Sequence, residues 1–495
     1  MGHKVKKKSP GNIQSILWTD GIKYSNSYYE EDNFFTFLNI SHRFGERIDW
    51  NYDKYGKLWS YNLNYFDFLN QLEISKNAGL FLIRQFVRFE DESKDGKEPY
   101  PVSLRILNWV KFLSKNQVKD EIISSALYHD CRILLNNLEF HLLGNHLLEN
   151  AFALLFGSYY FQDEYFYKRS RDLLVTELNH QVMQDGAHFE LSPMYHQIIL
   201  FRLLDSIYLI RLNPTWKRDD LLSLLESKAS RMLSWLSNIT YANGDVPMVN
   251  DSTFDIAPSS DKLFTYSKYL GIAYSIIPLA DSGYRKVTRS NYEIFIDIGN
   301  VGPDFQPGHA HSDTLNFELR KEDNPIIVDT GISTYEKNSI RQHERSTSSH
   351  NTVKIGVIEQ TEVWGGFRVA KRAKISNLKE GPNLIQASHD GYLSSGYNHT
   401  RSFLWSEKHL ILLDEIDIST GSTAKAYFHL HFSVTKPLVD GNRVKLNPSG
   451  VIIEFSGLYS ISIKQYRLSA GFNKTNLAYK IVVIFDQSLK TIISL

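Results

Sequence analysis

The spacing of apolar residues changes type a little past the middle of the chain. Between about residues 61 and 274, apolar residues recur at helical spacing, in segments of ordinary helix length. The clearest of these segments are 102–113, 122–143, 146–161, 166–183 and 195–212. After Ile277-Pro278 the chain turns to short alternating runs rich in Val, Ile, Phe and Tyr, such as 292–298, 314–319, 326–329 and 410–416. An all-helical half followed by an all-strand half indicates a multidomain α+β chain whose second half is antiparallel sheet.

The length of the chain, 495 residues, exceeds what one hydrophobic core usually fills. Because the change of pattern falls near residue 280, the sequence predicts a helical domain over 1–280 and a β domain over 281–495. Cys131 is the only cysteine, so the chain forms no internal disulfide and no metal site built on several thiolates. Both domains are therefore expected to depend on packing alone.

Charge and hydropathy exclude two classes of partner. The 55 basic and 55 acidic residues give a formal net charge of zero, which argues against nucleic acid, because neutralising phosphates requires a basic excess. No run approaches the roughly 18 apolar residues of a membrane span. The basic residues near the N-terminus lack the apolar stretch of a secretory signal, which leaves a cytoplasmic protein or one whose leader has been removed. Anionic sugars and a homo-oligomer both remain open.

A histidine-rich segment, His309-Ala310-His311-Ser312-Asp313, begins the β half. Its alternation is strand-like, and a regular strand would turn His309, His311 and Asp313 to one face. Such a face either binds a divalent metal or is simply polar and exposed to solvent. Asp329 and His350, further along the chain, are the other candidate ligands.

Strand geometry makes a joint site of these residues difficult. If 314–329 forms a hairpin about the turn 321–324, Asp329 pairs near Asn316. That position lies roughly 16 Å from His311 at the rise of a strand. A shared site then requires a bend, a bulge or a partner on another strand.

Two segments of the helical half also carry polar side chains. Gly144 suits the end of one helix and Asn145 the start of the next, while His146 and Glu149 lie one turn apart, so that the carboxylate orients the imidazole. Further on, Ser192 suits a helix cap with Pro193 at the first helical position. Tyr195 then falls in the first turn, where the helix dipole slightly favours a phenolate. Capping and core packing explain the same residues without any chemistry.

Five segments together resemble the heparinase II/III-like polysaccharide lyases, within the glycosaminoglycan and alginate lyase superfamily. They are 144–150 (Gly-Asn-His-Leu-Leu-Glu-Asn), 188–196 (His-Phe-Glu-Leu-Ser-Pro-Met-Tyr-His), 250–252 (Asn-Asp-Ser), 309–313, and 345–353 (Arg-Ser-Thr-Ser-Ser-His-Asn-Thr-Val). Their order and approximate spacing agree with that family over about 59–372. The resemblance implies an N-terminal incomplete (α/α) toroid followed by a C-terminal antiparallel β-sandwich.

The resemblance also implies a role for individual residues. Tyr195 and His309 correspond to the family's catalytic tyrosine and histidine, and Asn145 and His146 to the groups that face the uronate carboxylate. The metal ligands implied are His311, Asp329 and His350, holding a divalent ion in a structural role, zinc first, with manganese or calcium as alternatives. Apart from the resemblance, supporting or substrate-binding positions are expected at Asn64, Tyr65, Arg105, Glu149, His188 and Arg345. Loop or capping roles explain Asn64, Tyr65 and Arg105 equally well, and an ordinary ion pair explains Arg345.

The implied reaction is β-elimination on a uronate-containing polysaccharide. Tyr195 would act as acid, or as both acid and base, and His309 as base when the two groups leave from opposite faces. Glycosaminoglycans such as heparan sulfate, chondroitin sulfate and hyaluronan are the expected substrates, with alginate or a bacterial exopolysaccharide as alternatives. A non-catalytic polysaccharide-binding or assembly protein and a metal-dependent hydrolase are the other readings.

Overall fold

The computed structural model describes residues 16–19, 21–216, 219–418 and 423–495. The N-terminal residues 1–12, in which the sequence predicts no signal, lie outside this range. Contacts divide the chain into two compact units, each discontinuous in sequence. The first comprises the described residues of Met1–Val182, Gln197–Leu233 and Asp261–Ser275, and the second those of Met183–His196, Ser234–Ser260 and Ile276–Leu495. The domain boundary at 280/281 stays a prediction.

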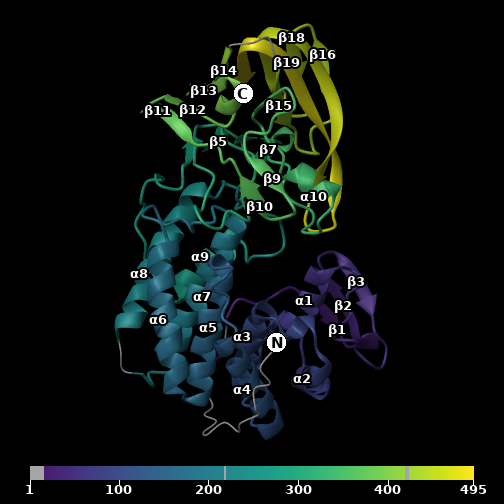
Figure 1. The fold of residues 1–495 in the computed structure, drawn as a ribbon, viewed down its shortest axis with the longest axis vertical. Coiled ribbons are helices and arrows are strands. Elements are labelled where there is room, and N and C mark those ends of the chain that lie inside the picture. The colour runs from purple at the N-terminus through teal and green to yellow at the C-terminus, as the bar shows by residue number, and fades with distance from the viewer. Residues whose placement is uncertain (1–15, 20, 217–218, 419–422) are drawn as a thin grey trace. The chain divides into compact units, whose positions relative to one another are not determined.

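Helices make up most of the first unit, coloured purple to teal in Figure 1. They are α1 (Lys57–Tyr65), α2 (Lys76–Phe89), α3 (Pro99–Lys115), α4 (Glu121–Asn136), α5 (Gly144–Phe161) and α6 (Glu164–Gln181), with most of α7 (Pro193–Leu212), α8 (Asp219–Ile239) and α9 (Ser260–Tyr269). A small antiparallel sheet precedes them, formed by β1 (Tyr28–Tyr29), β2 (Phe34–Phe37) and β3 (Ile40–Arg43). The five helices predicted from periodicity are confirmed.

Helix α4 ends seven residues earlier than the predicted segment 122–143. The side chains of Asn136 and Asn137 donate to the carbonyls of Arg132 and Ile133, at 2.8 and 2.7 Å. Short amide side chains that bond to nearby carbonyls compete with continuation of the helix. Residues 137–143 therefore form a bend and a turn with irregular backbone around them, and the expectation of helix over them is wrong.

Helix α5 is the centre of the first unit, because nearly all of its residues are buried. It packs against α3, α4 and α6. A helix that is hydrophobic on every side needs neighbours on every side. The few charges in this core are paired, as Glu149 is with Arg202 and Lys111 with Asp205. Closure of these helices into a toroid stays a prediction.

The second unit is built on antiparallel sheets, green to yellow in Figure 1. One has four strands in the order β4 (Tyr284–Thr288), β5 (Tyr292–Asp297), β6 (Phe317–Lys321) and β7 (Asn324–Ile327). A ten-stranded sheet contains β11 (Ile375–Gly381), β12 (Leu384–His389), β13 (Tyr397–Trp405), β14 (His409–Ile418), β19 (Thr475–Ser494), β18 (Ile452–Ser469), β17 (Arg443–Lys445) and β16 (Leu438–Asp440), with β15 (Ala424–His429) and β8 (Val353–Ile355) joined through β19. A two-stranded ribbon, β9 (Glu362–Trp364) and β10 (Arg368–Ala370), and the helix α10 (Ser339–Glu344) complete it.

The two large sheets share one hydrophobic core. Ile294, Phe317 and Ile327 of the four-stranded sheet belong to the same buried cluster as Phe403 and Phe455 of the ten-stranded sheet. Two sheets that bury their apolar faces against each other form a β-sandwich. The predicted fold class, a helical region followed by an antiparallel β-sandwich, is confirmed.

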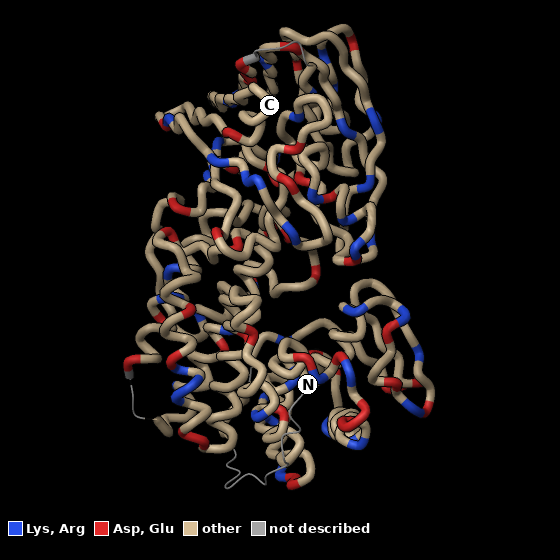
Figure 2. The backbone as a smooth tube through the Cα atoms, viewed as in Figure 1, with Lys and Arg blue, Asp and Glu red and all other residues tan. Residues whose placement is uncertain are grey.

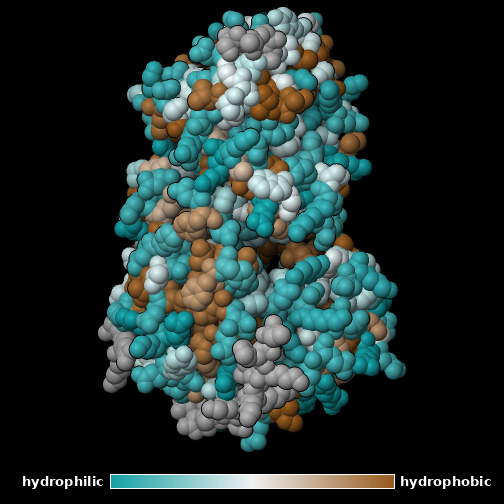
Figure 3. All heavy atoms as spheres, in the orientation of Figure 1, coloured by the Kyte–Doolittle hydropathy of each residue, from teal (hydrophilic) through white to brown (hydrophobic). Residues whose placement is uncertain are grey.

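Along the backbone drawn in Figure 2, Lys and Arg are interspersed with Asp and Glu in each unit. On the face drawn in Figure 3, hydrophilic residues predominate and hydrophobic ones form smaller groups among them. No helix in the described ranges has the length and apolar content needed to cross a membrane.

Candidate active site

The start of α7 is fixed by Ser192. Its hydroxyl oxygen accepts a hydrogen bond from the backbone N–H of Tyr195 at 3.3 Å, and Pro193 is the first helical residue. Ser192 also donates to the carbonyl of Asp251 at 3.0 Å. The predicted cap is confirmed, and it ties the first turn of α7 to the loop that carries Asp251.

Three aromatic side chains from separate segments of the second unit meet beside this turn. The rings of Tyr195 and His309 lie 4.2 Å apart between centroids. The Tyr195 hydroxyl is 3.1 Å from the hydroxyl of Tyr335. The fold thus brings together Tyr195 and His309, which the sequence predicts as catalytic, and adds Tyr335.

Asp251 holds the histidines of this site in place. Its Oδ2 is 2.8 Å from His309 Nδ1, and its Oδ1 is 2.9 Å from His311 Nε2. The guanidinium of Arg341 donates to both carboxylate oxygens, with Nη2 at 2.7 Å from Oδ2. Tyr195, His309, Tyr335, Asp251 and Arg341 are hereafter called the tyrosine–histidine cluster.

Electrostatics assign opposite tendencies to Asp251 and Tyr195. Burial by itself raises the pKa of Asp251, but the Arg341 charge and the hydrogen bonds from His309 and His311 lower this pKa well below its usual range. Burial raises the pKa of Tyr195 above its ordinary value, against a lowering by its hydrogen bond with Tyr335. Asp251 therefore stays ionised, and Tyr195 keeps its proton at neutral pH.

The segment 309–313 is a turn followed by coil, so the strand predicted there is wrong. Its shape comes from a distant residue, because the guanidinium of Arg345 donates to the carbonyl of Ala310 at 2.8 Å and the Arg345 carbonyl accepts from Ser312 N at 3.0 Å. A left-handed Leu315, with φ of 63°, then leads into β6. This is the bend that a joint site requires.

The predicted metal ligands lie in one neighbourhood as a result. The β6–β7 hairpin turns at 321–324, as predicted, and Asn316 donates to Asp329 at 2.7 Å. His350 Nδ1 is 2.8 Å from Asp329 Oδ2, and the rings of His350 and His311 are 5.3 Å apart.

The buried atoms His311 Nδ1 and His350 Nε2 have no hydrogen-bond partner within the described part of the chain. Two orphaned imidazole nitrogens would suit a metal, whereas Asp329 already accepts hydrogen bonds at both oxygens. Among the described residues, no group of three or more His, Cys, Asp and Glu side chains is arranged to hold an ion. A divalent metal here, zinc or another, stays a prediction.

In the first unit, Asn145 and His146 belong to the first turn of α5. The sequence predicts that Gly144 ends the preceding helix. Instead Gly144 begins α5, in a left-handed conformation with φ of 55°. His146 Nδ1 pairs with Glu139 at 3.0 Å, so the orienting carboxylate is Glu139 and not Glu149. Glu149 instead accepts from Arg202 Nε at 2.9 Å.

Glu139 is itself held by Asn150, which donates to Glu139 Oε2 at 2.9 Å and accepts from the Glu139 backbone N–H at 2.9 Å. Asn145 is 1% exposed, and the His146 side chain is 31% exposed with its ring 4.5 Å from that of Tyr100. Asn145, His146, Glu139 and Asn150 are hereafter called the α5 turn.

The positions predicted as supporting residues are mostly buried. Arg105, with no exposed surface, donates to Asp130 at 2.8 and 2.9 Å and to Gly96 O at 2.8 Å. Asn64 donates to Trp50 O and Ser60 O at 3.0 and 2.9 Å, Tyr65 packs near Tyr61 and Tyr100, and the backbone N–H of His188 donates to His196 Nδ1 at 3.2 Å. Arg345 donates to the carbonyl of Ala310. Their contact with substrate stays a prediction.

Two family models match the chain by sequence. The one described as "Heparinase II/III N-terminus" matches residues 101–270, and the one described as "Heparinase II/III-like, C-terminal" matches residues 273–494. The chain belongs to the heparinase II/III-like family. No curated protein matches it by sequence.

Solved structures with this fold include several lyases. Heparinase III superposes with a TM-score of 0.71 at 18% identity, covering 95% of this chain and 82% of the other. A mutant heparan sulfate lyase from Pedobacter heparinus gives 0.62 at 18%, covering 92% and 79%. A chondroitin AC lyase from Streptomyces coelicolor A3, in complex with chondroitin sulphate, gives 0.57 at 9%, covering 89% and 74%. At such identities the likeness concerns the fold alone.

Sequence reasoning about this heparinase II/III-like chain missed Glu139 and Asn150 of the α5 turn and three members of the tyrosine–histidine cluster. Asp251 stood in a matching segment but received no role, while Tyr335 and Arg341 were not singled out. A buried aspartate between an arginine and two histidines leaves no trace in local spacing. Asn150 offered a usable signal, because it adjoins Glu149 in the segment 144–150.

Proposed function

We propose that this chain is a polysaccharide lyase that cleaves a uronate-containing polymer, most suitably a glycosaminoglycan, by β-elimination. The observation that carries the proposal is the packing of the Tyr195 phenol against the His309 imidazole, whose Nδ1 is hydrogen-bonded to Asp251. A protonated phenol and an oriented imidazole are an acid and a base side by side. The family, and the lyases among the structures of the same fold, support the same reaction.

His309 takes the role of base. With Asp251 ionised, the 2.8 Å contact is a hydrogen bond that His309 Nδ1–H donates, which fixes the tautomer. Nε2 is then the nitrogen with a free lone pair. It removes the C5 proton of the uronate, and the electron pair of the broken C–H bond moves toward the carboxylate.

Tyr195 takes the role of acid. Because its pKa is raised, the phenol retains the proton that the leaving oxygen needs. The bond between C4 and O4 breaks as the C4–C5 double bond forms, and the phenol protonates O4. The alternative in which Tyr195 is also the base requires a phenolate, which its buried surroundings disfavour.

The α5 turn takes the role of stabilising the intermediate. Removing the C5 proton places negative charge on the uronate carboxylate, so donors must face it. Asn145 and His146 are the proposed donors, with Glu139 and Asn150 as positioning residues for His146. A divalent metal at His311, Asp329 and His350 would brace the loop that carries His309, and no step of the reaction depends on it.

Absorbance of the products tests the proposal, because elimination creates a conjugated double bond and hydrolysis does not. The full chain is incubated with heparan sulfate, chondroitin sulfate, hyaluronan and alginate, and absorbance near the ultraviolet band of unsaturated uronates is followed beside reducing ends. We expect absorbance and reducing ends to rise together on at least one glycosaminoglycan. Reducing ends without absorbance would indicate a hydrolase, and binding without either would indicate a binding protein; both outcomes overturn the proposal.

A further inference from the structure

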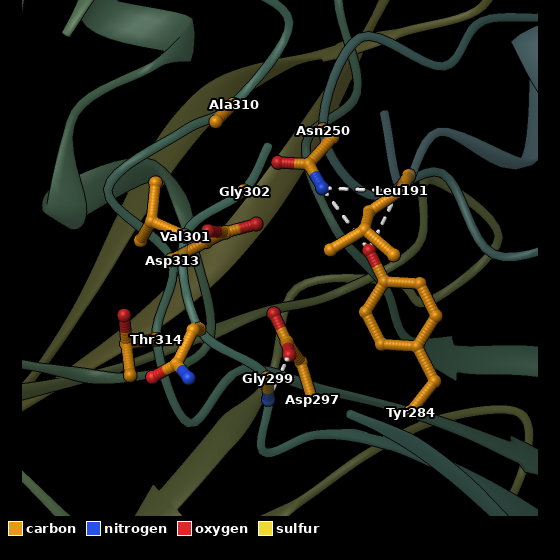
Figure 4. Close-up of a pocket in the computed structure, with 11 residues that line it drawn as sticks. Leu191, Asn250, Tyr284, Asp297, Gly299, Val301, Gly302, Ala310, Asp313 and Thr314 are labelled. Atoms are coloured by element: carbon orange, nitrogen blue, oxygen red, sulfur yellow. Dashed lines mark hydrogen bonds between the residues drawn. The ribbon is translucent and has the colours of Figure 1, made fainter. Parts of the chain in front are cut away.

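A small polar cavity lies in the second unit, beside the end of β5 (Figure 4). Its walls come from the start of β4, from the end of β5 and the loop that follows it, from residues 310–314, and from the loops at Leu191 and Asn250. Oxygen atoms dominate its polar lining, and the carboxyl groups of Asp297 and Asp313 both reach toward its interior.

No cationic side chain of the described residues lines this cavity beside its two carboxylates. Asp297 is 6% exposed and Asp313 is 3% exposed, and none of the described residues that line the cavity is Lys, Arg or His. Asp297 Oδ1 accepts one hydrogen bond, from Gly299 N at 2.8 Å. Asp313 Oδ2 has no partner among the described residues. Buried carboxylates are costly unless they are paired, protonated or bound to a cation.

A neutral oxygen beside them is also unpaired. The hydroxyl of Thr314, a residue that is 1% exposed, makes no hydrogen bond within the ranges that the structure describes. Arg345 and His350 act on Asp313 only from outside the cavity lining, while Asp329 adds a further negative charge. Two buried oxygens without protein partners among the described residues, beside a second carboxylate, suit a positively charged ligand.

We propose that this cavity binds one calcium ion, through the carboxylates of Asp297 and Asp313 and the hydroxyl of Thr314. Calcium takes six to eight oxygen ligands in flexible geometry, which carboxylates, hydroxyls, carbonyls and water supply together. The absence of imidazole and thiolate from the described lining disfavours zinc. The site is thus separate in chemistry from the predicted ion at His311, Asp329 and His350.

The ion would brace the segments that form the tyrosine–histidine cluster. Ala310 of the lining follows His309, Asn250 precedes Asp251, and Leu191 comes four residues before Tyr195. Asn250 already donates to Leu191 O at 3.0 Å and accepts from His311 N at 3.1 Å. A cation on Asp313 would fasten the loop after His311 to the end of β5.

Calcium titration of the full chain tests the site without any substrate, so its result is independent of the lyase activity. The protein is stripped with a chelator, and calcium or magnesium is added in a calorimeter and in a thermal melt. The variants are Asp313→Asn and Asp297→Asn, which keep side-chain shape. Asp304→Asn is the control, because Asp304 lies in the same loop with its side chain 97% exposed.

We expect the wild type and Asp304→Asn to bind one calcium ion and to melt at a higher temperature with it. Asp313→Asn and Asp297→Asn should lose both responses, and without calcium they should melt no lower than the stripped wild type, because the carboxylate repulsion is gone. A wild type that neither binds calcium nor shifts its melting temperature overturns the proposal, whatever the variants do. A calcium response that survives in both variants overturns it as well.

Discussion

The tyrosine–histidine cluster and the α5 turn reach their geometry in different ways. The cluster joins side chains from four segments between residues 195 and 341, and a buried ion pair between Asp251 and Arg341 lies at its centre. The α5 turn uses residues 139–150, and its hydrogen bonds are local. Side chains that transfer protons must be placed close to each other, whereas a side chain that donates a hydrogen bond to a carboxylate needs only a fixed orientation. The first demand requires tertiary structure and the second can be met by one helix turn.

The largest effect is expected from Tyr195→Phe, which removes the acid and leaves the ring. The kcat on the active glycosaminoglycan should fall by about 10²–10⁴-fold, the usual contribution of a positioned acid or base, with substrate binding retained. Steady-state kinetics and a binding assay measure the two quantities. Tyr165→Phe, at a tyrosine that is 62% exposed, is the control and should match the wild type. Turnover retained in Tyr195→Phe would remove this residue from the mechanism.

The next largest effect is expected from Arg341→Met, and it concerns the free energy of unfolding. Removing one partner of a buried ion pair costs about 3–5 kcal/mol of unfolding free energy, because Asp251 is left charged without the guanidinium that balances it. Urea unfolding of the second unit measures this loss. Arg443→Met removes an exposed pair with Glu454 and should cost no more than about 1 kcal/mol. Equal losses in the two variants would contradict a central role for the Arg341–Asp251 pair.

The α5 turn is tested by His146→Ala beside Glu139→Gln. Removing a donor that faces developing negative charge should lower kcat by about 10²–10³-fold, and Glu139→Gln should lower it less, since His146 remains. Neither change should affect unfolding of the second unit. If Glu139→Gln leaves both kcat and KM unchanged while His146→Ala does not, Glu139 does not position His146.

Periodicity predicted the elements that depend on local pattern. The helices, the Ser192–Pro193 start of α7 and the hairpin at 321–324 follow from spacing and cap chemistry alone. The hairpin even placed Asn316 beside Asp329, which the 2.7 Å hydrogen bond confirms. Residues whose neighbours lie within a few positions were therefore within reach of the sequence.

The loop 309–313 was not within reach, because its conformation depends on Arg345, 35 residues away. The alternating letters of this segment are typical of a strand, but hydrogen bonds to Arg345 and Asn250 hold it in another conformation. The pairing of His146 with Glu139 was missed for a similar reason, since residues 137–143 were expected to be helical. Tertiary hydrogen bonds overrode local pattern at both places.

Chelation tests the predicted ion of the second unit. If zinc or another metal occupies His311, Asp329 and His350, elemental analysis of the purified chain should find about one equivalent. Removing the ion should lower the free energy of unfolding by about 2.7 kcal/mol when the free metal concentration had been 100 times the dissociation constant. The kcat of the protein that remains folded should not change. Loss of kcat at unchanged stability would mean that the ion takes part in the reaction.

The smallest effect concerns Glu344, which lies beside the cluster and accepts a 3.0 Å hydrogen bond from Ser333 N. Burial raises its pKa to about 7, against lowering by the Ser333 hydrogen bonds and the Arg341 charge. A carboxyl whose pKa is higher in the folded than in the unfolded state binds more protons when folded, so stability falls as pH rises from about 4.5 to about 7, by at most about 1.4 kcal/mol per pH unit. Glu344→Gln should flatten that part of the profile, which urea unfolding at several pH values measures. Glu454→Gln, at a half-buried surface carboxylate of the same unit, should leave the profile as in the wild type. A slope that persists in Glu344→Gln would assign it to other buried groups.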